Sequence, residues 1–253
     1  RKAHFCAISS TSGTATEVTA FSIITDYQKG IKYPIADFEI TPDVAIVDPD
    51  LAETMPKKLV AHTGMDAMTH AIEAYVSTAH CDYTDPLAIF AIRMIQGDLV
   101  DSYNGDMAKR DSMHNAQCLA GMAFSNALLG IVHSMAHGLS ALYDTPHGVA
   151  CAILLPVGLE YNKSVAGERY RAVGKAMGVV GIDEMNDVEA ADATIAAVKQ
   201  LSADVGIPAN LHGILKEEDI QFLAESAYAD ACRPGNPRDT SVEEIVELYK
   251  SQL

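Results

Sequence analysis

The spacing of apolar and polar residues changes near residue 54 and divides the chain into two kinds of structure. Before that point, alternating or short apolar stretches have the pattern of strands at residues 4–10, 21–26, 31–35 and 44–47. After it, apolar residues recur every three or four positions, which is the spacing of helices that bury one face. The pattern predicts a mainly α protein, with a small β-rich segment at residues 1–53 and an all-helical domain at residues 54–253.

Turn residues, prolines and glycines set the expected boundaries. A turn at Gln28–Gly30 makes the second and third strands a hairpin, and small hydroxyl residues form a loop at 11–19. Pro56 suits the first turn of a helix. The expected helices cover residues 56–75, 86–103, 109–124, 128–143, 146–160, 168–177, 187–205, 216–231 and 241–252.

Composition limits the partners and the cellular compartment that we expect for this protein. With 253 residues and 49% hydrophobic content, the chain can bury a sizeable core. The formal net charge of −16 argues against nucleic acids and anionic membranes as partners, because both are polyanionic. Five scattered cysteines without a CxxC pair favour a reducing compartment, so we expect a cytoplasmic protein. The longest apolar stretch, residues 116–143, contains His133 and His137 and is expected to be a core helix.

Ionisable residues occur at helical spacing inside apolar stretches. Asp66 and His70 are four residues apart, and so are His133 and His137, which places each pair on one face of its helix. His147 follows just after a turn. The flanking residues are apolar or small: Met65, Ala67, Met68, Ala71, Ile72, Val132, Met135, Ala136 and Leu139. We therefore expect these groups to be buried, where ionisable side chains need partners or a metal.

Asp66, His70, His133 and His147 together offer one carboxylate and three imidazoles. Imidazole suits iron, zinc, copper and nickel, whereas calcium and magnesium prefer oxygen donors. The residues predict a transition-metal site and an enzyme. They leave open a metal-dependent hydrolase and a non-catalytic helical metal-binding or assembly module, since such a site can also activate water or only bind an ion.

The remaining histidines are not assigned to this site. His62 lies one turn before Asp66 and offers a further donor, but we leave it out of the ligand set. Three others have no partner at helical spacing, and we expect them at the surface: His80, His114 and His212.

Four segments, taken together and in order, resemble the iron-containing (group III) alcohol dehydrogenase family. They are STSGTATEVT at 10–19, VDPDL at 47–51, GMDAMTHAIEAY at 64–75 and GMAFSNALLGIVHSMAHGLSALYDTPHGVACAILLP at 121–156. Because they extend over essentially the whole chain, they are more specific than any single motif. The resemblance implies the helical C-terminal domain of the dehydroquinate synthase-like fold, and a homo-oligomer that is a dimer or larger.

The resemblance also implies an activity. It predicts a metal-dependent, NAD- or NADP-dependent alcohol dehydrogenase or aldehyde reductase that transfers a hydride between a small primary alcohol or diol and the cofactor. Iron(II), or zinc in some members, is bound at the positions of Asp66, His70, His133 and His147. His137 matches a position beside the nicotinamide, where it relays a proton. A weak fifth ligand and plain structural support are the alternatives for this histidine.

Five softer assignments follow from the same resemblance. Positions near the cofactor are matched by Thr11, Thr14 and Lys32. Positions that line the cleft for substrate and nicotinamide are matched by Phe124 and Cys232. Outside the resemblance, these residues fit an ordinary loop, a solvated lysine and two core side chains.

The family's α/β nucleotide-binding domain carries a Gly-rich GGGS-type turn that this sequence does not contain. The chain therefore resembles the helical half of the enzyme together with the last strands of the other half. We expect it to be inactive alone, because pyrophosphate binding relies on backbone N–H groups at such a turn. A glycerol dehydrogenase or dehydroquinate synthase relative, with a three-ligand zinc site, fits less well than the four-ligand branch.

Overall fold

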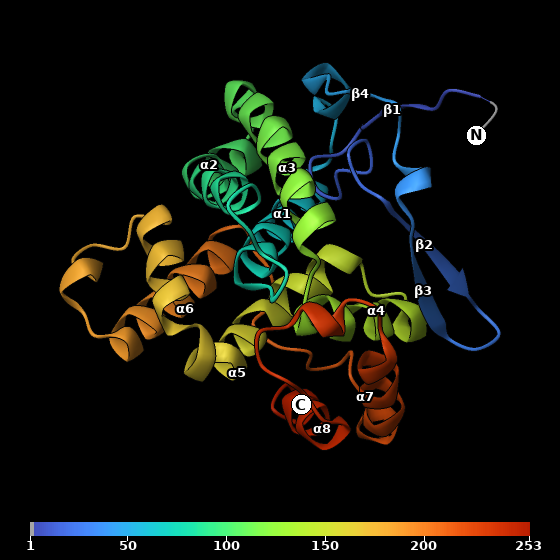
Figure 1. Ribbon diagram of the computed structural model, residues 1–253, viewed down its shortest axis with the longest axis vertical. Helices are drawn as coiled ribbons and strands as arrows, with labels where there is room; N and C mark the ends of the chain where they lie inside the picture. Colours follow the sequence, from blue (N-terminus) through green and yellow to red (C-terminus); the bar gives the residue numbers. More distant parts are fainter. Residues whose placement is uncertain (1–2) are drawn as a thin grey trace.

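The computed structural model describes residues 3–253 as a body of helices with short strands along one side (Figure 1). Within these residues the α-helices are α1 (Lys57–Val76), α2 (Asp85–Asn104), α3 (Met107–Ala127), α4 (Ile131–Tyr143), α5 (His147–Ala176), α6 (Asp187–Asp204), α7 (Ile220–Ala229) and α8 (Val242–Lys250). Short 3-10 turns cover Phe38–Ile40, Pro49–Ala52, Ile182–Glu184, Glu217–Asp219 and Arg233–Gly235. The predicted mainly α fold with N-terminal strands is confirmed.

The strands form two small sheets in the described chain. β1 (Cys6–Ile8) pairs in parallel with β4 (Val44–Ile46), and β2 (Phe21–Asp26) pairs antiparallel with β3 (Ile31–Ala36). The predicted hairpin is therefore confirmed. Its turn is closed by Asp26, whose Oδ1 accepts hydrogen bonds from the backbone N–H groups of Gln28 and Lys29.

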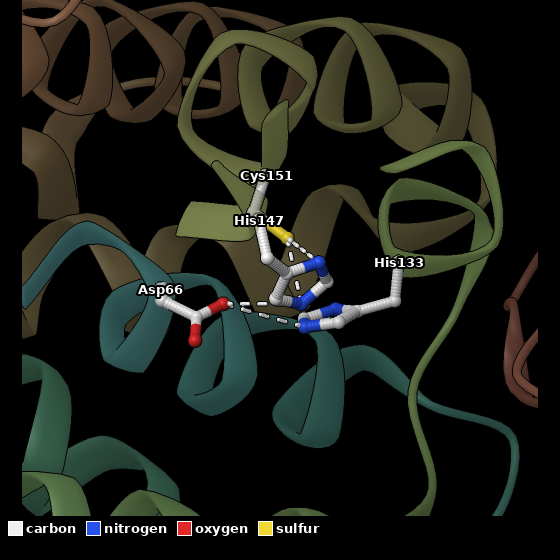
Figure 2. Close-up of side chains that lie close together, drawn as sticks. All are labelled: Asp66, His133, His147 and Cys151. Carbon is white, nitrogen blue, oxygen red and sulfur yellow. Dashed lines mark hydrogen bonds and ion pairs between the residues drawn. The ribbon is translucent and has the colours of Figure 1, made fainter. Parts of the chain in front are cut away.

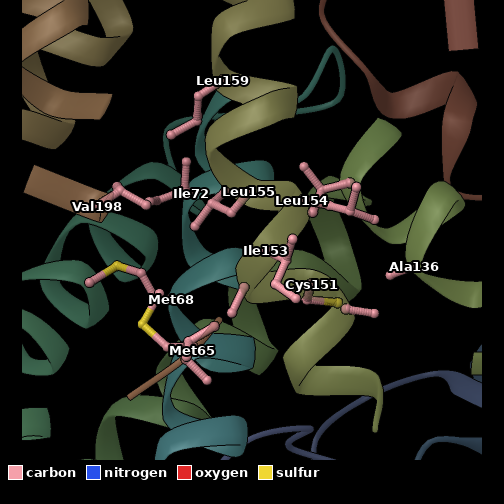
Figure 3. Close-up of a cluster of buried hydrophobic side chains, with 14 of the residues drawn as sticks. Met65, Met68, Ile72, Ala136, Cys151, Ile153, Leu154, Leu155, Leu159 and Val198 are labelled. Atoms are coloured by element: carbon pink, nitrogen blue, oxygen red, sulfur yellow. The ribbon is translucent and has the colours of Figure 1, made fainter. Parts of the chain in front are cut away.

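The core is built around α1, which packs against α2, α3 and α5. Every residue from Gly64 to Ala74 on this helix is buried. Figure 3 shows Met65, Met68 and Ile72 of α1 near side chains from α5 and α6, among them Leu155 and Val198. Because α1 is buried on all sides over these residues, a polar group on it must find its partner inside the protein.

Helix α5 differs from the sequence prediction. We expected two helices, at 146–160 and 168–177, but α5 runs unbroken from His147 to Ala176 with Pro156 inside it. Tyr161, Asn162 and Ala166 in the expected gap are buried. Their packing outweighs the weak helix propensity of this stretch, since tertiary contacts routinely override propensity.

Helix α3 covers the loop between β1 and β2. Gly121 permits this approach, because a Cβ there would lie 2.2 Å from the Cβ of Ala15. The expectation that His114 is a surface residue is wrong. This histidine is fully buried, with Nδ1 3.0 Å from Ser12 Oγ and Nε2 3.3 Å from Ser9 Oγ. The loop hydroxyls satisfy the ring, and helical spacing alone could not reveal them.

Helices α3 and α4 contain the long apolar stretch noted in the sequence. In the described chain, no single helix is long and apolar enough to cross a bilayer. Helices α3 and α4 taken together, with a bend of 106° between them, are long and apolar enough, by length and composition only. Both helices carry many buried residues, as expected of core helices.

The contact between α5 and α1 leads to a prediction about stability. A Cβ on Gly148 would lie 2.1 Å from the carbonyl oxygen of His62, and backbone cannot move aside cheaply. Gly148→Ala should lower the free energy of unfolding by about 1–3 kcal/mol, measured by urea denaturation. Gly97→Ala on exposed α2 surface, with nothing within 4 Å, is the control and should stabilise by about 0.5–1 kcal/mol. Equal effects of both changes would contradict the close approach.

Candidate metal centre

Three helices bring the four predicted metal ligands together. Asp66 and His70 lie on α1, His133 on α4, and His147 at the start of α5. Asp66 Oδ1 lies 4.0 Å from His70 Nε2, 3.7 Å from His133 Nε2 and 3.6 Å from His147 Nε2. Figure 2 shows the side chains of Asp66, His133 and His147 pointing toward one another. The three Nε2 atoms thus each lie within 4.0 Å of one carboxylate oxygen. His70 is nevertheless outside the group of donors that all lie within 4.8 Å of one another, which consists of Asp66, His133, His147 and Cys151.

The donors fit a divalent transition metal. Donors at about 2.1 Å from a tetrahedral ion are about 3.4 Å apart, slightly less than the separations from Asp66 Oδ1. Asp66 and His133 are 3% and 1% exposed, and within the described residues Asp66 Oδ1 and His133 Nε2 have no hydrogen-bond partner. Buried polar atoms are usually paired, and an ion bound among these donors would give both atoms a partner.

Glu73 connects α1 to α4 next to the predicted metal ligands. It lies seven residues after Asp66 on α1, and its Oε2 is 2.5 Å from His133 Nδ1. Its Oε1 accepts a 2.8 Å hydrogen bond from the backbone N–H of Val132 in the first turn of α4, where a negative charge is favourable. A carboxylate on the far nitrogen of a histidine fixes the tautomer that leaves Nε2 free to bind a metal.

The protonation states also suit a metal. Burial alone would raise the pKa of Asp66, but His70, His147 and His133 outweigh burial and hold this pKa well below its usual range. Burial lowers the pKa of His70 to about 4 and of His147 to about 3, although Asp66 opposes the shift in both. Near neutral pH the site therefore presents an ionised carboxylate and two neutral imidazoles, the forms that bind metals.

His133 is shifted in the opposite direction. Burial lowers its pKa, but Cys151, Glu73 and Asp66 outweigh burial and raise the pKa well above its ordinary value. These groups therefore favour positive charge at His133. A proton and a metal ion are alternative ways to supply it.

His137 and its partner lie beside this centre. His137 is one turn beyond His133, its ring stacks on that of His147 with centroids 5.3 Å apart, and its Nδ1 is 2.8 Å from Asp230 Oδ2. The other carboxylate oxygen of Asp230 accepts a hydrogen bond from the backbone N–H of Cys232. With Nδ1 on Asp230, Nε2 of His137 is the atom available to a substrate.

A cavity of about 380 Å³ opens in front of the centre, between the helices and the hairpin. Of the predicted residues, its walls include Thr14, Lys32, His70, Phe124, His133, His137, His147 and Cys232. Phe124 stacks on His70 with centroids 4.3 Å apart. Thr11 is not among the lining residues. The structure therefore gathers all but one of the softer assignments around one cavity.

A second cavity is larger but is lined by fewer ionisable and metal-binding side chains. It measures about 600 Å³ and lies between α5, α6 and the C-terminal end, with Glu160 and Lys199 in its walls. It contains none of the predicted site residues. We therefore place the functional site at the smaller cavity, because perturbed ionisable groups converge there.

Three residues of the site were not predicted from the sequence: Glu73, Asp230 and Cys151. Glu73 shares a face of α1 with Asp66 and His70, and Cys151 is four residues after His147, so helical spacing contained a signal for both. Asp230 is 93 residues from His137 in the chain, and no local pattern connects them.

Comparison with protein families supplies the class. A model of the C-terminal part of the Fe-containing alcohol dehydrogenase family matches residues 60–253, and a model described as iron-containing alcohol dehydrogenase matches residues 1–49. The chain therefore belongs to the iron-containing alcohol dehydrogenase family.

Individual relatives agree with this assignment. The chain is 54% identical to the NADPH-dependent butanol dehydrogenase of Clostridium saccharobutylicum over 98% of its own length and 65% of the relative's. It is 47% identical to the lactaldehyde reductase of Escherichia coli K12, over 96% and 64%. A crystal structure of 1,3-propanediol oxidoreductase is 40% identical and superposes with a TM-score of 0.93, over 98% and 65%. The chain thus spans just under two thirds of these relatives.

The role of Glu73 can be tested by removing its charge. Glu73→Gln keeps the shape of the side chain but weakens the orientation of His133, so metal affinity should fall by about 10–100-fold, as for other partners of metal-bound histidines. Calorimetric titration of metal-free protein with zinc measures this. Glu160→Gln on exposed α5 surface is the control and should leave the affinity unchanged. An unchanged affinity in Glu73→Gln would show that the carboxylate only caps α4.

Proposed function

We propose that this chain provides the metal and substrate site of an NAD- or NADP-dependent alcohol dehydrogenase or aldehyde reductase for small primary alcohols or diols. The observation that carries the proposal is the ring of imidazole nitrogens around the unpartnered Oδ1 of Asp66, at the wall of a cavity of about 380 Å³. A cavity of this size suits a small substrate together with part of a cofactor.

In this proposal Asp66, His70, His133 and His147 hold iron(II) or zinc. The metal supplies positive charge that favours the anionic form of an alcohol oxygen, and the nicotinamide supplies or accepts the hydride. Glu73 keeps His133 oriented, and the surrounding core excludes water from the ligand side. Phe124 and Cys232 shape the apolar part of the pocket and so limit the substrate's size.

His137 has the role of moving a proton. Oxidation of an alcohol to an aldehyde releases the hydroxyl proton, and reduction consumes one. Asp230 accepts from Nδ1 of His137 and so leaves Nε2 as the atom that takes or gives this proton. Because His137 also lines the hollow beneath the hairpin, together with Ser134 and Glu225, the proton has a path toward solvent.

Cofactor contacts in the proposal come from the N-terminal segment. Thr14 and Lys32 line the same cavity as the α4 histidines, and Thr11 lies in the same hydroxyl-rich loop as Thr14. Residues 1–53 then belong to the nucleotide-binding part and residues 54–253 to the metal-binding part. Because the chain spans just under two thirds of its relatives, the activity is proposed for a protein in which a dinucleotide-binding segment accompanies it.

The setting we propose is the cytoplasm, and the assembly is a homo-oligomer that is a dimer or larger. Free thiols at Cys118, Cys151 and Cys232 are consistent with a reducing compartment. Light scattering on the purified protein would measure the assembly.

Metal binding should stabilise the fold, because the ligands come from three helices. At a metal concentration 100 times the dissociation constant, the free energy of unfolding should rise by about 2.7 kcal/mol. Each kcal/mol should raise the melting temperature by about 2–4 °C. His147→Ala should remove most of this gain in a thermal melt with iron(II) or zinc. His62→Ala, also on α1 but outside the cluster, is the control and should keep it. Equal responses of the two variants would refute the ligand set.

The activity is tested by following reduced-nicotinamide absorbance with 1,2-propanediol, 1,3-propanediol, ethanol and butanol, with iron(II) present. We expect turnover when the dinucleotide-binding segment is present, and a kcat about 10²–10⁴-fold lower in His137→Asn, since general acid–base groups contribute that much. Metal affinity should stay unchanged in this variant. No absorbance change with any of these alcohols, when metal and the dinucleotide-binding segment are both present, would contradict the dehydrogenase and favour the hydrolase instead.

A further inference from the structure

A fifth donor lies at the metal centre, from a residue outside the predicted ligand set. Four side chains each offer one donor atom here, and these four atoms all lie within 4.8 Å of one another: Asp66, His133, His147 and Cys151 (Figure 2). Cys151 Sγ is 3.5 Å from His147 Nε2. Cys151 is fully buried, and its thiol lies beside the unpartnered atoms Asp66 Oδ1 and His133 Nε2.

Helix α5 places this sulfur where it does. Cys151 follows His147 by four residues, so both side chains lie on the same face of the first turns of α5. Gly148 lies between them and lets α5 approach His62 of α1. The contact that brings His147 to Asp66 therefore also brings Cys151 to the site.

The other cysteines do not share this arrangement. Cys6 and Cys81 are exposed, and Cys118 lies on α3. Cys232 clusters with His137 and Asp230, but there the imidazole and the carboxylate are already hydrogen-bonded to each other at 2.8 Å. Cys118 lies near Glu17, whose Oε2 is also buried and without a hydrogen-bond partner, but among the described residues the clusters of three or more possible metal donors include Cys151 and Cys232 and not Cys118.

We propose that Cys151 is a metal donor, and that its thiolate with Asp66, His133 and His147 forms a four-donor set for zinc-like ions that competes with the set containing His70. This inference rests on the metal centre proposed above. When the metal–sulfur bond forms, the S–H bond breaks and the proton leaves to solvent, so no oxidant or reductant is needed. Thiolate is a soft donor that favours zinc over iron(II), whereas a set of imidazoles and a carboxylate favours neither as strongly.

The two donor sets differ in one donor, the thiolate of Cys151 in place of the imidazole of His70. Four protein donors that include a thiolate match the closed tetrahedral arrangement of structural zinc sites. In that arrangement His70 is released, and it remains stacked between Phe124 and His133. Cys151 thus determines which metal the site retains.

Cobalt(II) is the probe for the experiment, because its visible bands report binding and a near-ultraviolet charge-transfer band reports a thiolate ligand. One equivalent is added to metal-free protein, its Cys151→Ser variant and a Cys118→Ser control. We expect visible bands in all three proteins. The near-ultraviolet band should appear in the unchanged protein and in Cys118→Ser, and be lost in Cys151→Ser.

A competition between metals gives a second measure. Cys151→Ser should lower the preference for zinc over iron(II) by about ten-fold or more, a factor that corresponds to about 1.4 kcal/mol. Cys118→Ser should leave the preference unchanged. Both readouts are independent of enzyme activity.

Each contrary result has a distinct meaning. Visible cobalt bands without the near-ultraviolet band in the unchanged protein would overturn the role of Cys151 but leave the proposed metal centre intact. A near-ultraviolet band that persists in Cys151→Ser would assign the sulfur to another cysteine and also overturn it. No visible bands in the unchanged protein would overturn both this inference and the metal centre.

Discussion

A carboxylate buried in the middle of α1 is the constraint on which the site depends. Asp66 is 3% exposed on a helix whose neighbouring residues are all buried. An ionised group in such surroundings is costly unless positive charge is close by. His133 from α4 and His147 from α5 converge on it with nitrogen atoms less than 4 Å away. Groups from three helices therefore surround the buried charge of Asp66, and the proposed metal would add positive charge at the same point.

Glu73 and Asp230 make this arrangement rigid. Each binds the Nδ1 of one histidine on α4, and each also accepts a backbone N–H, from Val132 and Cys232 respectively. The imidazoles are thereby held in one tautomer and one orientation. A site whose partners are themselves held by backbone keeps its geometry with little rearrangement when an ion or a substrate arrives.

The sequence revealed part of this site but not all of it. Asp66 with His70, and His133 with His137, repeat at the helical period, and their apolar flanks predicted burial. The hairpin and the positions of most helices also followed from local pattern. Asp230 did not, because its approach to His137 depends on how α7 packs on α4. The burial of His114 depends in the same way on a loop about 100 residues earlier in the chain.

The length of α5 also could not be predicted from local sequence pattern. Its middle contains weak helix formers, yet buried contacts of Tyr161 and Ala166 keep it helical. Local pattern therefore determines which residues can share a face, and packing determines which faces meet.

The cavity is lined on one side by packed helices and on the other by a loop and a hairpin. Its metal-facing wall comes from helices packed in the core, where a donor can be held within a few tenths of an ångström. Its other wall comes from the loop around Thr14 and from the hairpin that carries Lys32, where short hydroxyls, backbone groups and one half-buried lysine lie at the opening. Burial lowers the pKa of this lysine, and Asp144 opposes the shift. Loops of this kind adapt to a ligand that enters and leaves, whereas a metal ion requires donors at fixed positions, so the division of the cavity between loop and core suits the two ligands that we propose for it.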